Sequence, residues 1–95
     1  MIRKANTMNS FYDRKLILAP MAGISDFPFR SICRAYGADI VYTEMVSAKG
    51  IHYHDKKTNL LLETSPEESP LVVQLFGSEP DIIAEACSYI QKKGF

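Results

Sequence analysis

Three apolar runs along the chain predict β-strands. Residues 15–20 (KLILAP) and 70–77 (PLVVQLFG) are almost continuously hydrophobic, whereas residues 38–45 (ADIVYTEM) are more mixed. Continuous runs rich in valine, isoleucine and leucine are typical of strands that are covered on both faces, as in a parallel sheet. The pattern therefore predicts three parallel strands.

A helix is predicted over residues 25–37, between the first two strands. Ser25 or Asp26 can cap its N-terminus, Pro28 falls in the first turn, where its missing N–H does no harm, and Gly37 ends it. Apolar side chains recur at spacings of three and four, which predicts one buried stripe made of Phe29, Ile32, Cys33 and Tyr36.

Another helix follows the third strand, with Ser78 as the expected N-cap and Pro80 in its first turn. Glu79 and Asp81 place negative charge near the positive end of the helix dipole, and Gly94 ends the helix. The face expected to be buried consists of Ile82, Ile83, Ala86, Cys87 and Ile90.

Residues 47–70 are less regular and predict one or two short helices, with residues 60–62 packing inward, followed by a polar loop. The order β-α-β-α-β-α requires right-handed crossovers and a parallel sheet. An open doubly wound sheet and a (β/α)₈ barrel both fit this order.

The length of the chain bears on the choice between these folds, because a complete barrel takes about 250 residues. The 95 residues are either a small open α/β unit or, as we favour, the first part of something larger. Residues 1–14 are expected to form a flexible N-terminal tail, and residues 15–95 the folded domain.

Composition and charge exclude several classes of protein. The chain is 46% hydrophobic and 23% charged, which is ordinary for a soluble globular protein. It contains no membrane-length apolar run and no signal peptide, so a cytoplasmic location is expected. Eleven basic residues balance eleven acidic ones, which argues against a domain that grips nucleic acid by itself.

Neither a disulfide scaffold nor a metal site is expected. Cys33 and Cys87 are far apart and belong to no C-x-x-C pair, so both are predicted to be small buried hydrophobic residues in a reducing cytosol. His52 and His54 invite a metal interpretation, but no third ligand has suitable spacing.

Ligand contacts in parallel α/β folds come from the C-terminal ends of the strands and the loops that follow. After the first strand, Pro20 ends the backbone ladder, and Ala22 and Gly23 are small enough for close backbone approach. Met21 is a soft side chain suited to packing on an aromatic plane. A plain turn explains the same residues equally well.

Gln74 lies within an otherwise apolar strand. A buried amide must find hydrogen-bond partners or cost about 1–3 kcal/mol, so it is either a satisfied core glutamine or a contact to the polar edge of a heterocycle. Glu44 raises the same question, although a solvated loop carboxylate is the commoner outcome. No G-x-G-x-x-G, Walker A or G-x-S-x-G motif is present.

Three segments in order resemble the N-terminal part of the tRNA-dihydrouridine synthase family: LAPMAGISDFPFR (18–30), TEMVSAKG (43–50) and VVQLFGSEPD (72–81). The motif APM alone is also found in other FMN barrels, such as dihydroorotate dehydrogenases, whereas the three motifs in order are specific. The resemblance extends from about Leu16 to Phe95. It implies that this chain is the N-terminal, incomplete portion of an FMN-binding (β/α)₈ TIM barrel, which is followed in the family by a helical RNA-binding domain.

The resemblance implies a flavin-dependent oxidoreductase that reduces the C5–C6 bond of uridine in tRNA to dihydrouridine, with FMN as cofactor and NADPH as reductant. It implies that Pro20, Met21 and Ala22 lie against the flavin ring, with their backbone available to it. Gln74 would hydrogen-bond the isoalloxazine edge, and Glu44 and Met45 would line the same cavity.

The family's catalytic cysteine follows the fourth strand, in an N-x-G-C-P segment that this chain lacks. Cys33 and Cys87 fall on apolar helix faces, so no residue here is assigned as catalytic. We therefore expect an N-terminal fragment that is inactive alone, with tRNA as the substrate of the full-length enzyme and the basic residues that hold it elsewhere.

Two alternatives remain. One is a fragment of another FMN-dependent barrel oxidoreductase that acts on a small molecule. The other is a non-catalytic half-barrel module that self-associates along its open sheet edges.

Overall fold

The protein folds as strands alternating with helices. The computed structural model describes residues 13–95, so the predicted tail lies outside the described residues except for its last two positions. Three strands form a parallel sheet in the order β1-β2-β4: β1 (Ile17–Leu18), β2 (Ile40–Tyr42) and β4 (Leu71–Val72). A second parallel pair consists of β3 (Val46–Ser47) and β5 (Leu75–Phe76).

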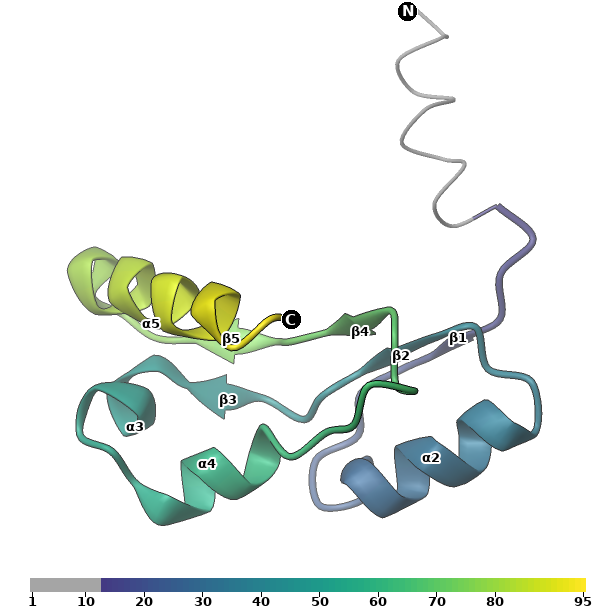
Figure 1. The fold of residues 1–95 in the computed structure, drawn as a ribbon. Coiled ribbons are helices and arrows are strands. Elements are labelled where there is room, and N and C mark those ends of the chain that lie inside the picture. Colours follow the sequence, from purple (N-terminus) through teal and green to yellow (C-terminus); the bar gives the residue numbers. More distant parts are fainter. Residues whose placement is uncertain (1–12) are drawn as a thin grey trace, which may run out of the picture.

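The two sheets lie end to end in the direction of the strands, so that β2 leads into β3 and β4 leads into β5. Figure 1 shows them as one band, with β1, β2 and β4 at one end and β3 and β5 at the other. The predicted third strand, residues 70–77, is thus divided into β4 and β5, and the predicted second strand continues past its interruption as β3. The predicted α/β class with parallel strands is confirmed, and the arrangement is compatible with part of a barrel.

Apolar residues pair across the first sheet. Ile17 lies opposite Ile40, and Val41 lies opposite Leu71. Ile40 and Val41 in the central strand are buried, but Ile17 is 39% exposed, so the prediction that this run is covered on both faces is wrong. β1 is an edge strand among the described residues, which leaves its outer side without a covering element.

Helix α2 (Phe27–Ala35) begins and ends as its sequence predicts. Asp26 is the N-cap, and its Oδ1 accepts a hydrogen bond of 3.0 Å from Phe29 N–H. Gly37 adopts a left-handed φ of 116° just after the helix, a conformation that favours glycine.

The predicted apolar stripe of α2 is only partly buried. Phe29 and Cys33 are half-buried, whereas Ile32 and Tyr36 are 59% and 88% exposed, because no described element packs over them. The buried residue of α2 is instead Arg30, which is 1% exposed.

Two short helices, α3 (Ala48–His52) and α4 (Lys56–Leu61), confirm the prediction for the irregular segment. The long helix α5 (Pro80–Lys92) does not use Ser78 as its cap, which corrects that prediction. Glu79 stands at the N-cap position, and its carboxylate lies 3.8 Å from Lys49 Nζ instead of capping the helix. No helix within residues 13–95 has the length and apolar character needed to cross a membrane.

The main hydrophobic core lies between the β3–β5 pair and helices α3, α4 and α5. Its buried members are Val46, Ala48, Ile51, Leu62, Ala86 and Ile90. Of the residues expected to pack inward at the end of α4, Leu62 is buried and Leu61 half-buried, but Leu60 is 67% exposed. Cys87 is exposed rather than buried, because it faces an open apolar hollow that it lines together with Leu75 and Ile90.

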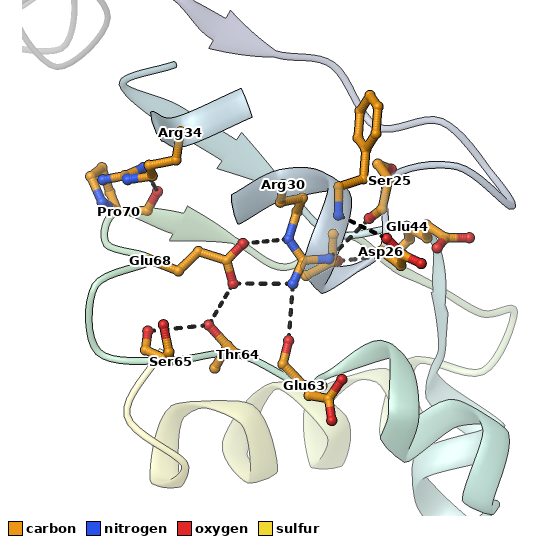
Figure 2. A network of polar contacts seen from close by, with 12 residues as sticks. Ser25, Asp26, Arg30, Arg34, Glu44, Glu63, Thr64, Ser65, Glu68 and Pro70 are labelled. Carbon is orange, nitrogen blue, oxygen red and sulfur yellow. Dashed lines mark hydrogen bonds and ion pairs between the residues drawn. The ribbon is translucent and has the colours of Figure 1, made fainter. Parts of the chain in front are cut away.

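A buried ion pair joins α2 to the loop before β4 (Figure 2). Arg30 donates from Nε to Glu68 Oε2 at 2.6 Å and from Nη2 to Glu68 Oε1 at 3.1 Å. The same guanidinium donates to the carbonyl oxygens of Ser25 at 2.9 Å and Glu63 at 3.0 Å. The hydroxyl of Thr64 donates to Glu68 Oε1 at 2.6 Å. The charges therefore meet several partners in place of water.

Truncating either member of this pair is expected to destabilise the fold. Arg30→Ala or Glu68→Ala leaves the other charge buried and unpaired, which costs about 3–5 kcal/mol in the free energy of unfolding. The double variant Arg30→Met/Glu68→Leu removes both charges and should lose less than either single change. Urea titration followed by circular dichroism measures these differences.

Glu67→Ala is the matched control, because Glu67 is the same residue type one position earlier and is exposed. It should change the free energy of unfolding by no more than about 0.5 kcal/mol. Equal losses in Glu67→Ala and Glu68→Ala would contradict the importance of the pair.

Candidate functional site

The segment after β1 is a tight turn closed by a serine. The Met21 N–H donates to Ser25 Oγ at 2.8 Å, and the same hydroxyl donates to the Met21 carbonyl at 3.0 Å. The backbone N–H groups of Ile24 and Ser25 reach that carbonyl as well, at 3.0 and 2.9 Å. Gly23 has a φ of 76°, so glycine is favoured at this position.

These contacts decide which backbone groups of the turn remain open. Both polar groups of the Met21 backbone are engaged within the turn, contrary to the expectation that they are available to a ligand. The N–H of Ala22 has no hydrogen-bond partner within residues 13–95. Pro20 is half-buried and Ala22 is exposed.

Glu44 connects the turn to the second strand. Its Oε1 accepts a hydrogen bond of 2.6 Å from the N–H of Gly23, and the residue is only partly exposed. A carboxylate that accepts a backbone N–H makes one of the stronger kinds of hydrogen bond. Glu44 is therefore a link between two strand ends rather than a free loop carboxylate.

Thr43 bridges the interruption between β4 and β5. Its N–H donates to the Val72 carbonyl at 2.9 Å, and its hydroxyl accepts the Gln74 N–H at 3.1 Å. The ladder then resumes, with the Val46 N–H donating to the Gln74 carbonyl at 2.8 Å. Because the Thr43 hydroxyl replaces a backbone acceptor here, the strands shift register while the backbone N–H of Gln74 keeps a hydrogen-bond partner.

The side chain of Gln74 is the exception in this arrangement. Its Oε1 is buried and has no hydrogen-bond partner. A buried acceptor left unpaired costs about 1–3 kcal/mol, so native proteins rarely retain one without a reason. Gln74 is not the satisfied core glutamine that the sequence left open.

Parallel strands place these residues along one edge of the sheet. We call residues 20–23, residues 43–45 and Gln74 the strand-end surface. The Gly23–Glu44 and Thr43–Gln74 hydrogen bonds join its three parts. Met21 and Met45 are 37% and 51% exposed there. The surface offers flexible apolar side chains, an open backbone donor and an unpaired acceptor, which suits a flat ligand with a polar edge.

The cysteines and histidines lie elsewhere. Cys33 is on α2 and Cys87 on α5, and neither belongs to the strand-end surface. His52 Nδ1 on α3 lies 3.0 Å from Glu85 Oε2 on α5. Among the residues described by the structure, no three His, Cys, Asp or Glu side chains are grouped so that they could hold a metal ion.

Comparison with known proteins decides the family. The sequence profile described as "Dihydrouridine synthase (Dus)" matches residues 17–95, which include the whole strand-end surface. This chain belongs to the dihydrouridine synthase family. The resemblance carried by the three motifs is confirmed.

Curated members of the family are similar over most of this chain. A "Probable tRNA-dihydrouridine synthase" of Helicobacter pylori is 41% identical over 75 residues, which are 79% of this chain and 23% of the relative. The "tRNA-dihydrouridine synthase B" of Pseudomonas aeruginosa is 44% identical over 72 residues (76% and 22%). A "Probable tRNA-dihydrouridine synthase" of Aquifex aeolicus is 42% identical over 84 residues (88% and 26%). The chain spans about a quarter of the length of these relatives.

The structure adds residues to the site that sequence patterns did not single out for it. Ser25 was expected only as a possible helix cap, and Thr43 only as a strand residue, yet both organise the strand-end surface. Arg30 and Glu68 are 38 positions apart in the sequence, and Arg30 connects their ion pair to the surface through its hydrogen bond to the Ser25 carbonyl. No periodicity or spacing signals such long-range polar pairing.

The link between Glu44 and Gly23 is expected to control local opening of the turn. Glu44→Ala removes the acceptor and should speed hydrogen exchange of the Gly23 amide about tenfold, because a hydrogen bond to a charged group contributes about 1.5 kcal/mol or more. Glu44→Gln keeps an acceptor oxygen and should show a smaller increase. Site-resolved exchange by NMR distinguishes the variants, and equal Gly23 exchange rates in the parent and Glu44→Ala would refute the link.

Proposed function

We propose that this chain forms part of the FMN-binding wall of a tRNA-dihydrouridine synthase, and that its folded domain, residues 15–95, is part of a (β/α)₈ barrel. When bound, FMN that has been reduced by NADPH would supply the hydride for reduction of the C5–C6 bond of a uridine in tRNA. The residues of this chain bind and orient the cofactor. The observation that carries the proposal is the buried, unpartnered Oε1 of Gln74 on the strand-end surface of a dihydrouridine synthase family member.

The chemistry of Gln74 fits an isoalloxazine ring. The oxidised ring presents one N–H on its pyrimidine part, between two carbonyl groups, and Gln74 Oε1 is an acceptor that lacks a donor. Binding would remove the penalty that the free protein bears at this position. A group that is unfavourable in the free protein and satisfied in the complex is expected of a binding residue.

The turn after β1 fits the face of the same ring. Ala22 presents little bulk next to Pro20, and the partly exposed thioether of Met21 suits contact with an aromatic plane. The open N–H of Ala22 is available to a ring nitrogen or oxygen. Met45, 51% exposed, offers a second apolar side chain on the strand-end surface.

No residue of this chain is proposed as the proton donor. A general acid must lie within hydrogen-bond reach of the atom that it protonates. Cys33 and Cys87 lie on helices α2 and α5 rather than on the strand-end surface. The role of residues 13–95 is therefore cofactor binding and not proton transfer.

The tRNA substrate is inferred from the three relatives described above, which are named as tRNA-dihydrouridine synthases. A flavin enzyme acting on a free small molecule is not favoured, since none of these relatives is so named. The net charge of zero supports a cofactor wall rather than an RNA grip for this segment.

A chimera tests the function directly. In it, residues 17–95 replace the matching segment of the Pseudomonas aeruginosa tRNA-dihydrouridine synthase B. It should bind FMN and form dihydrouridine in tRNA isolated from cells that lack this modification, as measured by mass spectrometry of the nucleosides. A folded chimera that binds no FMN would overturn the proposal.

Gln74→Leu separates binding from stability. In the 95-residue chain it removes an unpaired buried acceptor and should leave the free energy of unfolding unchanged or raise it, by up to about 1 kcal/mol. In the chimera it removes the acceptor for the flavin and should weaken FMN binding about tenfold, equivalent to about 1.4 kcal/mol. Denaturant titration and flavin fluorescence measure the two effects. A large loss of stability with unchanged FMN affinity would instead identify Gln74 as a structural residue.

The 95 residues on their own are expected to bind FMN negligibly and to be inactive. In barrels that bind phosphate, the phosphate site is formed by the loops after strands seven and eight. Titration of the purified chain should give no saturable binding up to about 1 mM FMN. A dissociation constant of about 1 mM corresponds to a binding free energy of only about −4 kcal/mol. Co-purification of one flavin per chain, seen by its visible absorbance, would contradict this expectation.

A further inference from the structure

The side chain of Ser25 is buried, and within residues 13–95 it hydrogen-bonds only the turn that precedes it. The residue is 0% exposed, and its hydroxyl both accepts from the Met21 N–H at 2.8 Å and donates to the Met21 carbonyl at 3.0 Å. It is not the cap of α2, because Asp26 Oδ1 holds the Phe29 N–H. The side chain of Ser25 therefore serves the turn rather than the helix.

Ser25 is in turn held from the other side (Figure 2). Its carbonyl accepts a hydrogen bond of 2.9 Å from Arg30 Nη1, and the guanidinium is fixed by Glu68 through two contacts of 2.6 and 3.1 Å. Arg30 Nη2 also reaches the Glu63 carbonyl at 3.0 Å. A continuous series of polar contacts thus runs from the loop before β4, through Arg30 and Ser25, to Met21.

We propose that Ser25 is a positioning residue for flavin binding, acting through Met21 and Ala22 without touching the cofactor. This inference rests on the proposed function. By engaging both polar groups of the Met21 backbone, the hydroxyl fixes the peptide that precedes Ala22 and leaves the Ala22 N–H as an open donor on the strand-end surface. The carbonyl contact with Arg30 keeps Ser25 in the place where it can do so.

The physical consequence is a shift of population in the turn. Without the hydroxyl, the partly buried Met21 N–H can exchange its partner for water, and the turn samples other conformations. Apparent affinity falls in proportion to the fraction of molecules that hold the binding conformation. If that fraction falls to about one tenth, FMN binds about tenfold more weakly.

The test compares Ser25→Ala with Asp26→Ala in the chimera defined above. The two changes are adjacent, and each removes a side-chain oxygen that accepts a backbone N–H. Of the two side chains, only that of Ser25 hydrogen-bonds the turn after β1. Ser25→Ala should weaken FMN binding about tenfold and alter the visible spectrum of the bound flavin. Asp26→Ala should leave both within about twofold of the parent. Unfolding curves establish that both variants are folded under the conditions used.

Hydrogen exchange supplies a readout that does not need the cofactor. In the 95-residue chain, the Met21 amide should exchange faster in Ser25→Ala than in the parent, and at the parent rate in Asp26→Ala. This pattern would support the hold of the Ser25 hydroxyl on the Met21 backbone whether or not flavin binds to the isolated chain.

The outcomes separate the two proposals. A folded parent chimera that binds no FMN overturns the proposed function, and with it the flavin role of Ser25. A parent chimera that binds FMN, together with Ser25→Ala and Asp26→Ala variants that have equal FMN affinities and equal Met21 exchange, overturns only the positioning role.

Discussion

The arrangement of the strand-end surface depends on the buried ion pair between Arg30 and Glu68. Removing two charges from water costs several kcal/mol for each ion, and this cost is offset only when every donor and lone pair finds a partner. All three guanidinium nitrogens and both carboxylate oxygens of the pair have hydrogen-bond partners, which include the Ser25 and Glu63 carbonyls and the Thr64 hydroxyl. These requirements fix α2, the loop before β4 and the turn after β1 relative to one another. Apolar packing in this part of the molecule is weaker, since Ile32 and Tyr36 are exposed.

The second constraint is the interruption between the two parallel sheets. A continuous ladder would use the backbone groups of residues 43–45 and 73–74 for pairing between strands. Here the Thr43 hydroxyl takes over one acceptor position, and Glu44 is free to bond the turn after β1. The interruption therefore places polar side chains at the edge where the strands end, and it leaves Gln74 Oε1 without a partner. A local departure from regular structure and an unpaired acceptor in the same place are typical of functional sites.

Periodicity and end signals predicted much of the fold because they reflect local physics. The Asp26 cap and the Gly37 end follow from residues close in sequence, and the parallel pairing follows from the alternation of strands and helices. The sequence misled where burial depends on distant partners. Cys87 fits the apolar stripe of α5 but is exposed, since it faces an open hollow. Ser78 is a favourable N-cap residue, but α5 begins at Pro80 and its N-cap position is Glu79. The same holds for the candidate site. Its motif residues were identified from the sequence, whereas the hydrogen bonds that Ser25, Arg30 and Thr43 make there were not.

The supports of the site also determine which of its polar groups have no hydrogen-bond partner within residues 13–95. Ser25 engages the Met21 backbone, Glu44 engages the Gly23 N–H, and Thr43 engages the Gln74 N–H. After these contacts, the Ala22 N–H and Gln74 Oε1 remain, a donor and an acceptor along one edge of the sheet. Saturating the neighbouring groups fixes the backbone at both positions, so little ordering entropy remains to be lost when a ligand binds. Under the proposed function, the same contacts that stabilise the turn and the strand interruption would also favour a ligand with complementary polar atoms on a flat ring.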